Sequence, residues 1–147
     1  MTQYWSMKTF AGWWDEFRTY NIIGVDQEGV DICYRTLSDA QIQSRINADK
    51  FSEYVDRTFR EFAQWMQIGD LVLVGTGPTT KFNLAGVAKV TGDYCFDANR
   101  AVPRHLRTVK FLAQPLLPQP MQRFARTSRL ELIHETDFYE ATLSLIV

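Results

Sequence analysis

The sequence predicts one α+β domain in which a twisted, PUA/EVE-like sheet or small β-barrel is flanked by about three helices. Three observations support this fold class. Strand patterns recur at the start, in the middle and at the end of the chain, helix patterns separate them, and no repeat or flexible linker interrupts them. A chain of 147 residues with 46% hydrophobic residues can bury a core of its own. We therefore treat residues 1–147 as a single domain.

The first half of the chain alternates between segments with the residue spacing of a strand and segments with the residue spacing of a helix. Strand, helix, strand, helix and helix patterns cover residues 4–9, 12–20, 21–26, 38–46 and 51–67. The last of these is the clearest helix, because apolar residues recur along it at intervals of three and four. They form a stripe made of Tyr54, Val55, Phe59, Phe62 and Met66. Such a stripe is typical of a helix face that packs on the core.

The second half is rich in strand patterns. They cover residues 71–74, 82–90, 106–112, 130–133 and 141–147, with a short helix expected between the last two. Gly86 lies inside the second of these strands and predicts a bulge or a close approach of another group. Residues 114–122 contain three prolines and predict an extended surface connection. We expect the apolar tail at 141–147 to close the sheet.

Motifs for catalysis and metal binding are missing from the pattern. The run from Gly75 to Phe82 resembles a phosphate loop, but Thr80 and Phe82 stand where a glycine and a hydroxyl residue are required. The two histidines, His105 and His134, have no partner at metal-ligand spacing. Cys95 opposite His105 is interpreted as a buried cysteine rather than a nucleophile. We therefore expect no enzyme, no metal and no cofactor.

The sequence also bears on location. It has no signal-peptide pattern and no apolar run of membrane-spanning length. Its two cysteines, Cys33 and Cys95, sit in apolar company and give no sign of an oxidising compartment. We expect a cytoplasmic protein that does not bind membranes.

The charges are unevenly distributed although the net charge is only −1. No acidic residue occurs between Asp97 and Glu131, and this interval holds seven Lys and Arg residues. A stripe of this kind can produce a local positive field that attracts phosphate. The candidate phosphate-binding residues are Arg100, Arg104, His105, Arg107, Lys110, Arg123 and Arg126. The alternative is that these side chains point in several directions and only solubilise the domain.

Aromatic residues are interleaved with this basic interval. Tyr94 and Phe96 precede it, and Trp13 and Trp14 follow the first strand. Aromatic rings stack on bases while arginines hold phosphates, so the combination favours nucleic-acid binding. The alternative is that Tyr94 and Phe96 belong to the core and the arginines are solvated.

Five short motifs follow one another in an order that resembles a known group of domains. They are WDEF at 14–17, IGVDQEGVD at 23–31, IGDLV at 68–72, AGVAKVTGDY at 85–94 and HLRTVKFL at 105–112. The series resembles the EVE-like N-terminal domains of McrB-type modification-dependent restriction proteins, and more broadly the EVE, YTH and PUA superfamily. The likeness covers roughly residues 4 to 113.

The resemblance implies a barrel-like sheet with helices outside and a pocket that accepts one flipped, often modified, base. Similar domains build this pocket from the loop after Gly24 and the strand with Gly86. In relatives a tryptophan forms a cage wall where this chain has Val25. The alternatives are that Trp13, Trp14, Phe82 or Tyr94 supplies the wall, that the pocket holds something else, or that it is degenerate. The pocket candidates are Trp13, Trp14, Val25, Asp26, Phe82, Gly86, Tyr94 and Phe96.

These observations lead to one expected function and two alternatives. We expect a nucleic-acid-binding module that reads a modified base by flipping it, with DNA favoured over RNA. The resemblance implies a role in restriction or defence, with an effector nuclease or NTPase as a possible partner. The alternatives are a small-molecule or nucleotide-binding protein on the same scaffold, and a protein-interaction domain that uses the proline segment and the tail at 143–147.

Overall fold

The computed structural model describes residues 1–49, 53–125, 129–143 and 145. The strands are β1 (Tyr4–Thr9), β2 (Ile22–Val25), β3 (Leu71–Thr76), β4 (Asn83–Val90), β5 (Cys95–Phe96), β6 (His105–Ala113), β7 (Gln119–Pro120) and β8 (Leu130–Ile133). The helices are α1 (Ala11–Tyr20), α2 (Asp39–Asp49), α3 (Glu53–Arg60) and α4 (Glu135–Leu143). A π-helical turn, η1 (Glu61–Trp65), continues α3, and a 3-10 turn, η2 (Gln122–Phe124), precedes β8.

The described strands form one curled sheet, a half-barrel. Its order is β2-β6-β4-β3-β1-β8, with β5 paired to β6 and β7 paired to β4. β1 runs parallel to β3, and the other pairs are antiparallel. The order leaves β2 and β8 at the two edges, so a seam remains between them. The predicted α+β class with a twisted sheet is confirmed.

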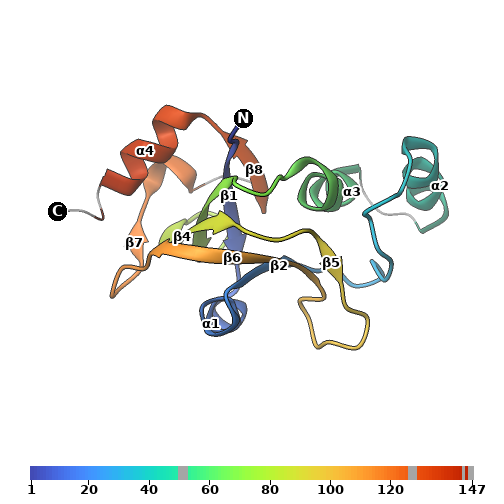
Figure 1. Ribbon diagram of the computed structural model, residues 1–147, viewed down its shortest axis with the longest axis horizontal. Coiled ribbons are helices and arrows are strands. Elements are labelled where there is room, and N and C mark those ends of the chain that lie inside the picture. Colours follow the sequence, from blue (N-terminus) through green and yellow to red (C-terminus); the bar gives the residue numbers. More distant parts are fainter. Residues whose placement is uncertain (50–52, 126–128, 144, 146–147) are drawn as a thin grey trace.

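The helices lie on both sides of the strands. In the view of Figure 1, α1 lies below the sheet, and α3 and α4 lie above it. Phe17 of α1 and Phe59 and Phe62 of α3 and η1 are fully buried in the main core. A second, smaller core under α4 contains Phe82 and Phe138. The aromatic stripe on the clearest predicted helix therefore faces the core over most of its length.

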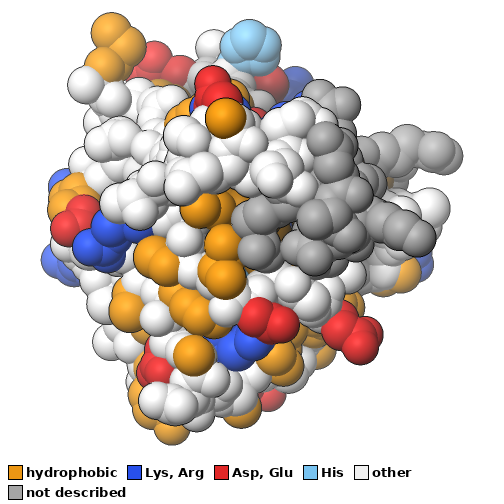
Figure 2. All heavy atoms as spheres, turned by 90° about the vertical axis from the view of Figure 1, so that its right-hand side faces the viewer, with side chains coloured by type: hydrophobic (Ala, Val, Ile, Leu, Met, Phe, Trp, Pro, Cys, Tyr) orange, Lys and Arg blue, Asp and Glu red, His pale blue; other side chains and the backbone are white. Residues whose placement is uncertain are grey.

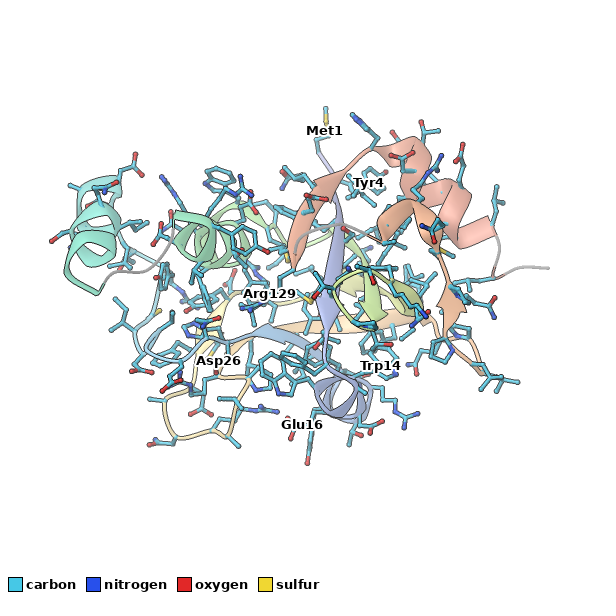
Figure 3. The ribbon with its side chains drawn as sticks, turned by 180° about the vertical axis from the view of Figure 1, so that it is seen from behind. Met1, Tyr4, Trp14, Glu16, Asp26 and Arg129 are labelled. Atoms are coloured by element: carbon cyan, nitrogen blue, oxygen red, sulfur yellow. The ribbon has the colours of Figure 1, made fainter. Side chains whose placement is uncertain are left out.

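Gly86 permits the close approach that the sequence predicts. The indole of Trp14 lies against it, and a Cβ added at residue 86 would stand 2.5 Å from Cη2 of Trp14. Figure 3 shows Trp14 pointing from α1 toward the strands. Register shifts next to Val74 and Val87 add irregularity to β3 and β4 on either side of this contact.

The C-terminal strand prediction is wrong in part. Residues 141–143, expected in a strand, belong to α4. Helix α4 packs on the second core through Phe138 and Ala141, so this segment is buried as one face of a helix. Residues 144, 146 and 147 lie outside the described part of the chain. The sequence also missed β5 and β7, which are two residues long each and carry no periodicity.

Of the helices that the structure describes, none has both the length and the apolar character to cross a bilayer.

Candidate functional site

The seam between β2 and β8 is bridged by one arginine. Arg129 precedes β8, and its Nη1 donates to the backbone oxygen of Asp26, just after β2, at 3.0 Å. Its Nη2 donates to Oε1 of Gln27 at 3.3 Å. Lys8, on β1, donates its backbone N–H to the Arg129 oxygen at 2.9 Å. Figure 3 shows Arg129 and Asp26 near each other at this edge of the sheet.

Two adjoining cavities lie on either side of Arg129. The first has a volume of about 540 Å³ and is lined by Lys8, Thr9, Phe10, Trp13, Gly24, Tyr54, Arg129 and residues 77–79. The second has about 510 Å³ and is lined by Phe10, Trp13, residues 26–29, Asp31, Val102, Arg104 and Arg129. Phe10, Trp13 and Arg129 line both. Each volume is in the range of pockets that hold small organic ligands.

Aromatic rings form the walls of the first cavity. Phe10 caps α1 in an extended conformation, and its side chain is 64% exposed. It meets Trp13 edge to face, with ring centroids 4.9 Å apart and planes at 90°. Tyr54, on α3, is 41% exposed and adds a third ring. The cavity at the junction between β1 and α1 is thus lined by large apolar side chains of the kind that a folded domain normally buries.

Polar groups at the end of β1 complete the first cavity. Thr9 is only 7% exposed, and its hydroxyl has no hydrogen-bond partner among the described residues. Lys8 donates from Nζ to the backbone oxygens of Thr79 at 2.9 Å and Ala125 at 2.7 Å. Burial lowers the pKa of Lys8, and Glu131 opposes this effect. The hydroxyl of Tyr54 accepts the backbone N–H of Arg129 at 3.0 Å, which leaves its own proton free to donate.

An ion pair forms the wall of the second cavity. Asp26 is 5% exposed and accepts from the backbone N–H of Arg104 at 2.7 Å and from its side chain at 2.8 and 2.9 Å. Burial alone would raise the pKa of Asp26, but hydrogen bonds from Arg104 and from the Gln27 backbone hold it below its usual value. Asp31 also accepts from Arg104 at 2.8 Å. The positive charge of Arg104 is therefore compensated by the carboxylates of Asp26 and Asp31.

The predicted pocket residues divide into two groups. Trp13 lines both cavities, and Asp26 lines the second. Trp14 instead covers Gly86 and contacts Phe111 edge to face at 5.4 Å. Phe82 lies in the second core, and Val25 in the main core. Trp14 thus fills the space above Gly86, Phe82 and Val25 are buried in separate cores, and none of the four lines either cavity.

Tyr94 and His105 belong to a buried network. The hydroxyl of Tyr94 accepts the backbone N–H of Tyr34 at 3.1 Å, so its proton goes to Nδ1 of His105 at 2.6 Å. The other ring nitrogen of His105 donates to the oxygen of Val30 at 2.8 Å. Phe96 packs on the same imidazole at 4.6 Å. The core interpretation of Tyr94 and Phe96 is therefore the one that the structure supports, and His105 does not reach the surface.

Arg107 is buried, contrary to its expected place on the surface. It is 4% exposed, and its guanidinium donates to the backbone oxygens of Phe62, Ala63, Met66 and Gly92. A phosphate cannot reach it there. Burial lowers the pKa of Arg107. The arginine compensates carbonyls at the end of η1 that the turn leaves without helical partners.

Two of the other four predicted basic residues are paired with acids. Arg100 binds Glu16 at 2.7 Å, and Arg123 binds Asp137 at 3.2 Å and also Glu140. Lys110 is exposed on β6. Arg126 lies outside the described residues. On the face shown in Figure 2, basic side chains stand in separate small groups with acidic ones beside them. The interval does not form one continuous basic stripe in the described part of the chain.

Sequence reasoning missed Phe10, Tyr54 and Arg129 as site residues. Phe10 stands between a strand and a helix pattern, and that junction was the one available signal. The apolar spacing assigns Tyr54 to the core stripe, yet the first turn of α3 leaves it exposed. Arg129 belongs to the basic interval of the sequence, but its contact with Asp26 spans about a hundred residues.

The cysteine and histidine side chains do not form a catalytic pair. Cys33 and Cys95 are both exposed free thiols, so the expectation of a buried cysteine is corrected: β5 turns Cys95 outward and buries its neighbour Tyr94. Both ring nitrogens of His105 are already hydrogen-bonded. Within the described ranges, no three His, Cys, Asp or Glu side chains gather as a metal site requires.

One protein family matches most of the chain. The model of a family described as "Domain of unknown function (DUF8426)" matches residues 11–133. No curated protein matches the chain.

Solved structures are similar in fold at low identity. A hypothetical protein from Leishmania major has 14% identity and a TM-score of 0.57, over 99% of this chain and 96% of that one. The Mmi1 YTH domain in complex with RNA has 9% identity and a TM-score of 0.56, over 99% and 78%. The YTH domain of Zygosaccharomyces rouxii MRB1, in complex with N6-methyladenosine RNA, has 10% identity and a TM-score of 0.52, over 98% and 86%. The fold is therefore YTH-like.

Proposed function

This chain belongs to the DUF8426 family, and we propose that it is a nucleic-acid-binding module that holds one modified base in the first cavity at the β2–β8 seam. The observation that carries the proposal is the wall made by the exposed ring of Phe10 and the half-buried ring of Trp13, which stand at right angles beside a buried Thr9 hydroxyl that has no partner among the described residues. The YTH domains with the same fold, whose structures contain RNA, support it.

The chemistry of base capture explains why this combination matters. A base that leaves its stack loses stacking energy and must be desolvated, so its pocket needs flat apolar walls and few polar groups for its edge. Phe10, Trp13 and Tyr54 offer such walls, and Thr9 offers a hydroxyl to which none of the described residues forms a hydrogen bond. A hydroxyl buried without a partner is costly, and a ligand edge would relieve this cost.

The proposal also concerns which polymer, DNA or RNA, carries the base. The motif series favours DNA, whereas the YTH complexes named above contain RNA. The experiment uses both DNA and RNA as single strands, because a base in a single strand does not have to break a base pair before it enters the pocket. A place in restriction or defence beside a nuclease or NTPase, a cytoplasmic location and the absence of enzymatic activity extend the proposal and rest on the sequence alone.

The decisive change is Trp13→Ala. We expect affinity for an oligonucleotide with one methylated base to fall by about 1–3 kcal/mol, because one stacking wall is lost. Fluorescence anisotropy with labelled single strands, methylated or plain, measures it. Trp65→Ala is the matched control: Trp65 is 43% exposed, lies under the Arg60 guanidinium at 5.5 Å, and lines neither cavity.

Two results would contradict the proposal. One is equal loss of binding in Trp13→Ala and Trp65→Ala, which would place the ligand elsewhere on the surface. The other is the lack of any binding to methylated or plain DNA and RNA by a wild-type protein that unfolds cooperatively. Circular dichroism of both variants checks that a loss of affinity is not a loss of fold.

A free nucleoside or nucleotide is the second candidate ligand. The specific observation in its favour is the internal pairing of Arg100, Arg104 and Arg107, which leaves few of the predicted cations for a polymer backbone. Thermal-shift measurements with free nucleosides separate the two candidates. Stabilisation by free ligand together with no binding of oligonucleotides favours the small ligand.

A further inference from the structure

We infer that the first cavity selects bases by charge: it accepts neutral bases that present hydrogen-bond acceptors, and it rejects bases that are cationic at neutral pH. The inference rests on the proposed function and adds the chemical class of the base. It follows from the composition of the cavity wall, where the aromatic rings stand beside two cationic side chains and beside groups that mainly donate hydrogen bonds.

Lys8 and Arg129 are the charged groups of this wall. Both line the first cavity, and none of the described residues that line it is acidic. The glutamate that acts on Lys8, Glu131, is not part of the lining. A cationic base placed in the cavity would therefore face two like charges at short range, in a partly desolvated space where such repulsion is strong.

The free hydrogen-bonding capacity of the wall points the same way. Lys8 gives two of its three N–H groups to backbone oxygens of Thr79 and Ala125, so one remains. Arg129 uses one N–H on each of Nη1 and Nη2, and its other donors are uncommitted in the described structure. Tyr54 accepts from Arg129 and keeps its own O–H as a donor. A base edge with carbonyl oxygens or unprotonated ring nitrogens matches this set.

The second cavity provides an internal contrast. Asp26, Glu28 and Asp31 line it together with Arg104 and Arg129, so its wall holds charges of both signs although it shares Phe10 and Trp13 with the first cavity. Arg129 stands between the two. The two neighbouring cavities therefore share Phe10, Trp13 and Arg129 but differ in their charged groups, which are only basic in the first cavity and mixed, with three acids, in the second.

Cation–π attraction is the opposing effect. Aromatic faces attract cations, and an aromatic pocket without basic residues would bind a cationic base well. In this site the guanidinium of Arg57 already lies over the Tyr54 ring, 5.9 Å from its centroid. Phe10 meets Trp13 edge to face, so part of that pair's π surface is used internally. With two cations in the wall, repulsion outweighs the remaining attraction.

Isomeric bases test the inference on the wild-type protein. Adenine methylated at N6 is neutral, and its isomer methylated at ring nitrogen N1 is cationic at neutral pH. Cytosine methylated at C5 and at ring nitrogen N3 forms a second such pair. Each base is placed in the same single-stranded oligonucleotide, in DNA and in RNA, and dissociation constants are measured by anisotropy at one salt concentration. We expect the neutral isomer to bind at least about tenfold more tightly in the pair that fits the cavity.

Lys8→Met tests the cause. Removing this ammonium should reduce the preference for the neutral isomer several-fold while the cationic isomer gains affinity. Lys89→Met is the matched control, since Lys89 is exposed on β4 and lines neither cavity. The ratio of two ligands on one protein does not depend on the fraction of the variant that is folded.

The outcomes are distinct. A cationic isomer that binds as well as its neutral counterpart, or better, overturns the charge inference and leaves the proposed function standing. A neutral preference that Lys8→Met leaves unchanged also overturns it, because the discrimination then arises from shape. If no oligonucleotide binds, the proposed function falls and this inference with it.

Discussion

At the residue scale, the role of each arginine depends on what lies within reach of its guanidinium. The alternation of β6 is visible in the sequence, and the structure buries His105, Arg107 and Val109 on one face. The sequence does not show that η1 brings three backbone oxygens to the same place as Arg107. A buried arginine and a phosphate-binding arginine look the same in a sequence, because the difference lies in distant carbonyl groups.

Arg107→Met tests this structural role. The change removes donors from four backbone oxygens and leaves them buried without partners, so we expect the free energy of unfolding to fall by about 3–5 kcal/mol. Urea denaturation measures it. Lys110→Met, on the same strand but exposed, should change stability by no more than about 0.5 kcal/mol. Unchanged stability in Arg107→Met together with weaker nucleic-acid binding would contradict the buried role.

At the scale of elements, α3 and the loop between β3 and β4 flank the first cavity. Each brings one exposed cation near it. Arg57 lies over the ring of Tyr54, a wall of the cavity, and Lys81 follows the lining segment 77–79. Both lie outside the basic interval that drew attention in the sequence. We expect the backbone of a strand bound in the cavity to pass near these two positions.

Arg57→Ala and Lys81→Ala should weaken binding of methylated and plain strands alike, since phosphates carry no information about the base. If each contacts one phosphate, the slope of log affinity against log salt should decrease by about 0.7 per variant for a single strand. Arg123→Ala is the control, because Arg123 is paired with Asp137 and Glu140 at α4. Selective loss for the methylated strand would assign these residues to base recognition instead.

At the scale of the whole molecule, the limits of sequence reasoning follow from distance along the chain. Periodicity and helix-capping residues located every described strand longer than two residues and the four described α-helices, because these signals are local. The seam is different: Asp26 and Arg129 meet across the two edges of the sheet, and no local pattern records that contact. Trp13 was identified from its neighbourhood, whereas Phe10 and Tyr54 join it only after the sheet has curled.

The buried network around His105 couples this architecture to pH. His105 links β6 to Val30 and, through Tyr94, to the backbone of Tyr34. Burial lowers its pKa below the ordinary value of 6.5; the hydrogen bond to Val30 and the charge of Asp26 act against this shift but do not reverse it. The imidazole is therefore neutral when folded, with its proton on Nε2, and Nδ1 accepts from Tyr94. A second proton would remove that acceptor.

The sign of the pH effect follows from proton uptake. Below pH 6.5 the unfolded chain protonates its histidine while the folded chain does not, so the unfolded state gains protons and the free energy of unfolding falls. The loss is at most about 1.4 kcal/mol per pH unit and continues down to the folded pKa. It precedes the contribution of Asp26, whose pKa is also lowered and whose stabilisation is lost only as pH falls below its ordinary value of 3.8.

Urea denaturation of the wild type at a series of pH values between 7.5 and 4.5 measures this dependence, and we expect stability to decline from just below pH 6.5. His105→Gln should be less stable at neutral pH and should lose that part of the slope, because the titrating group is gone. His134→Gln should keep it, since His134 is exposed. A slope that persists in His105→Gln, or that disappears in His134→Gln, would show that the acid response arises outside the network that joins β5, β6 and the segment after β2.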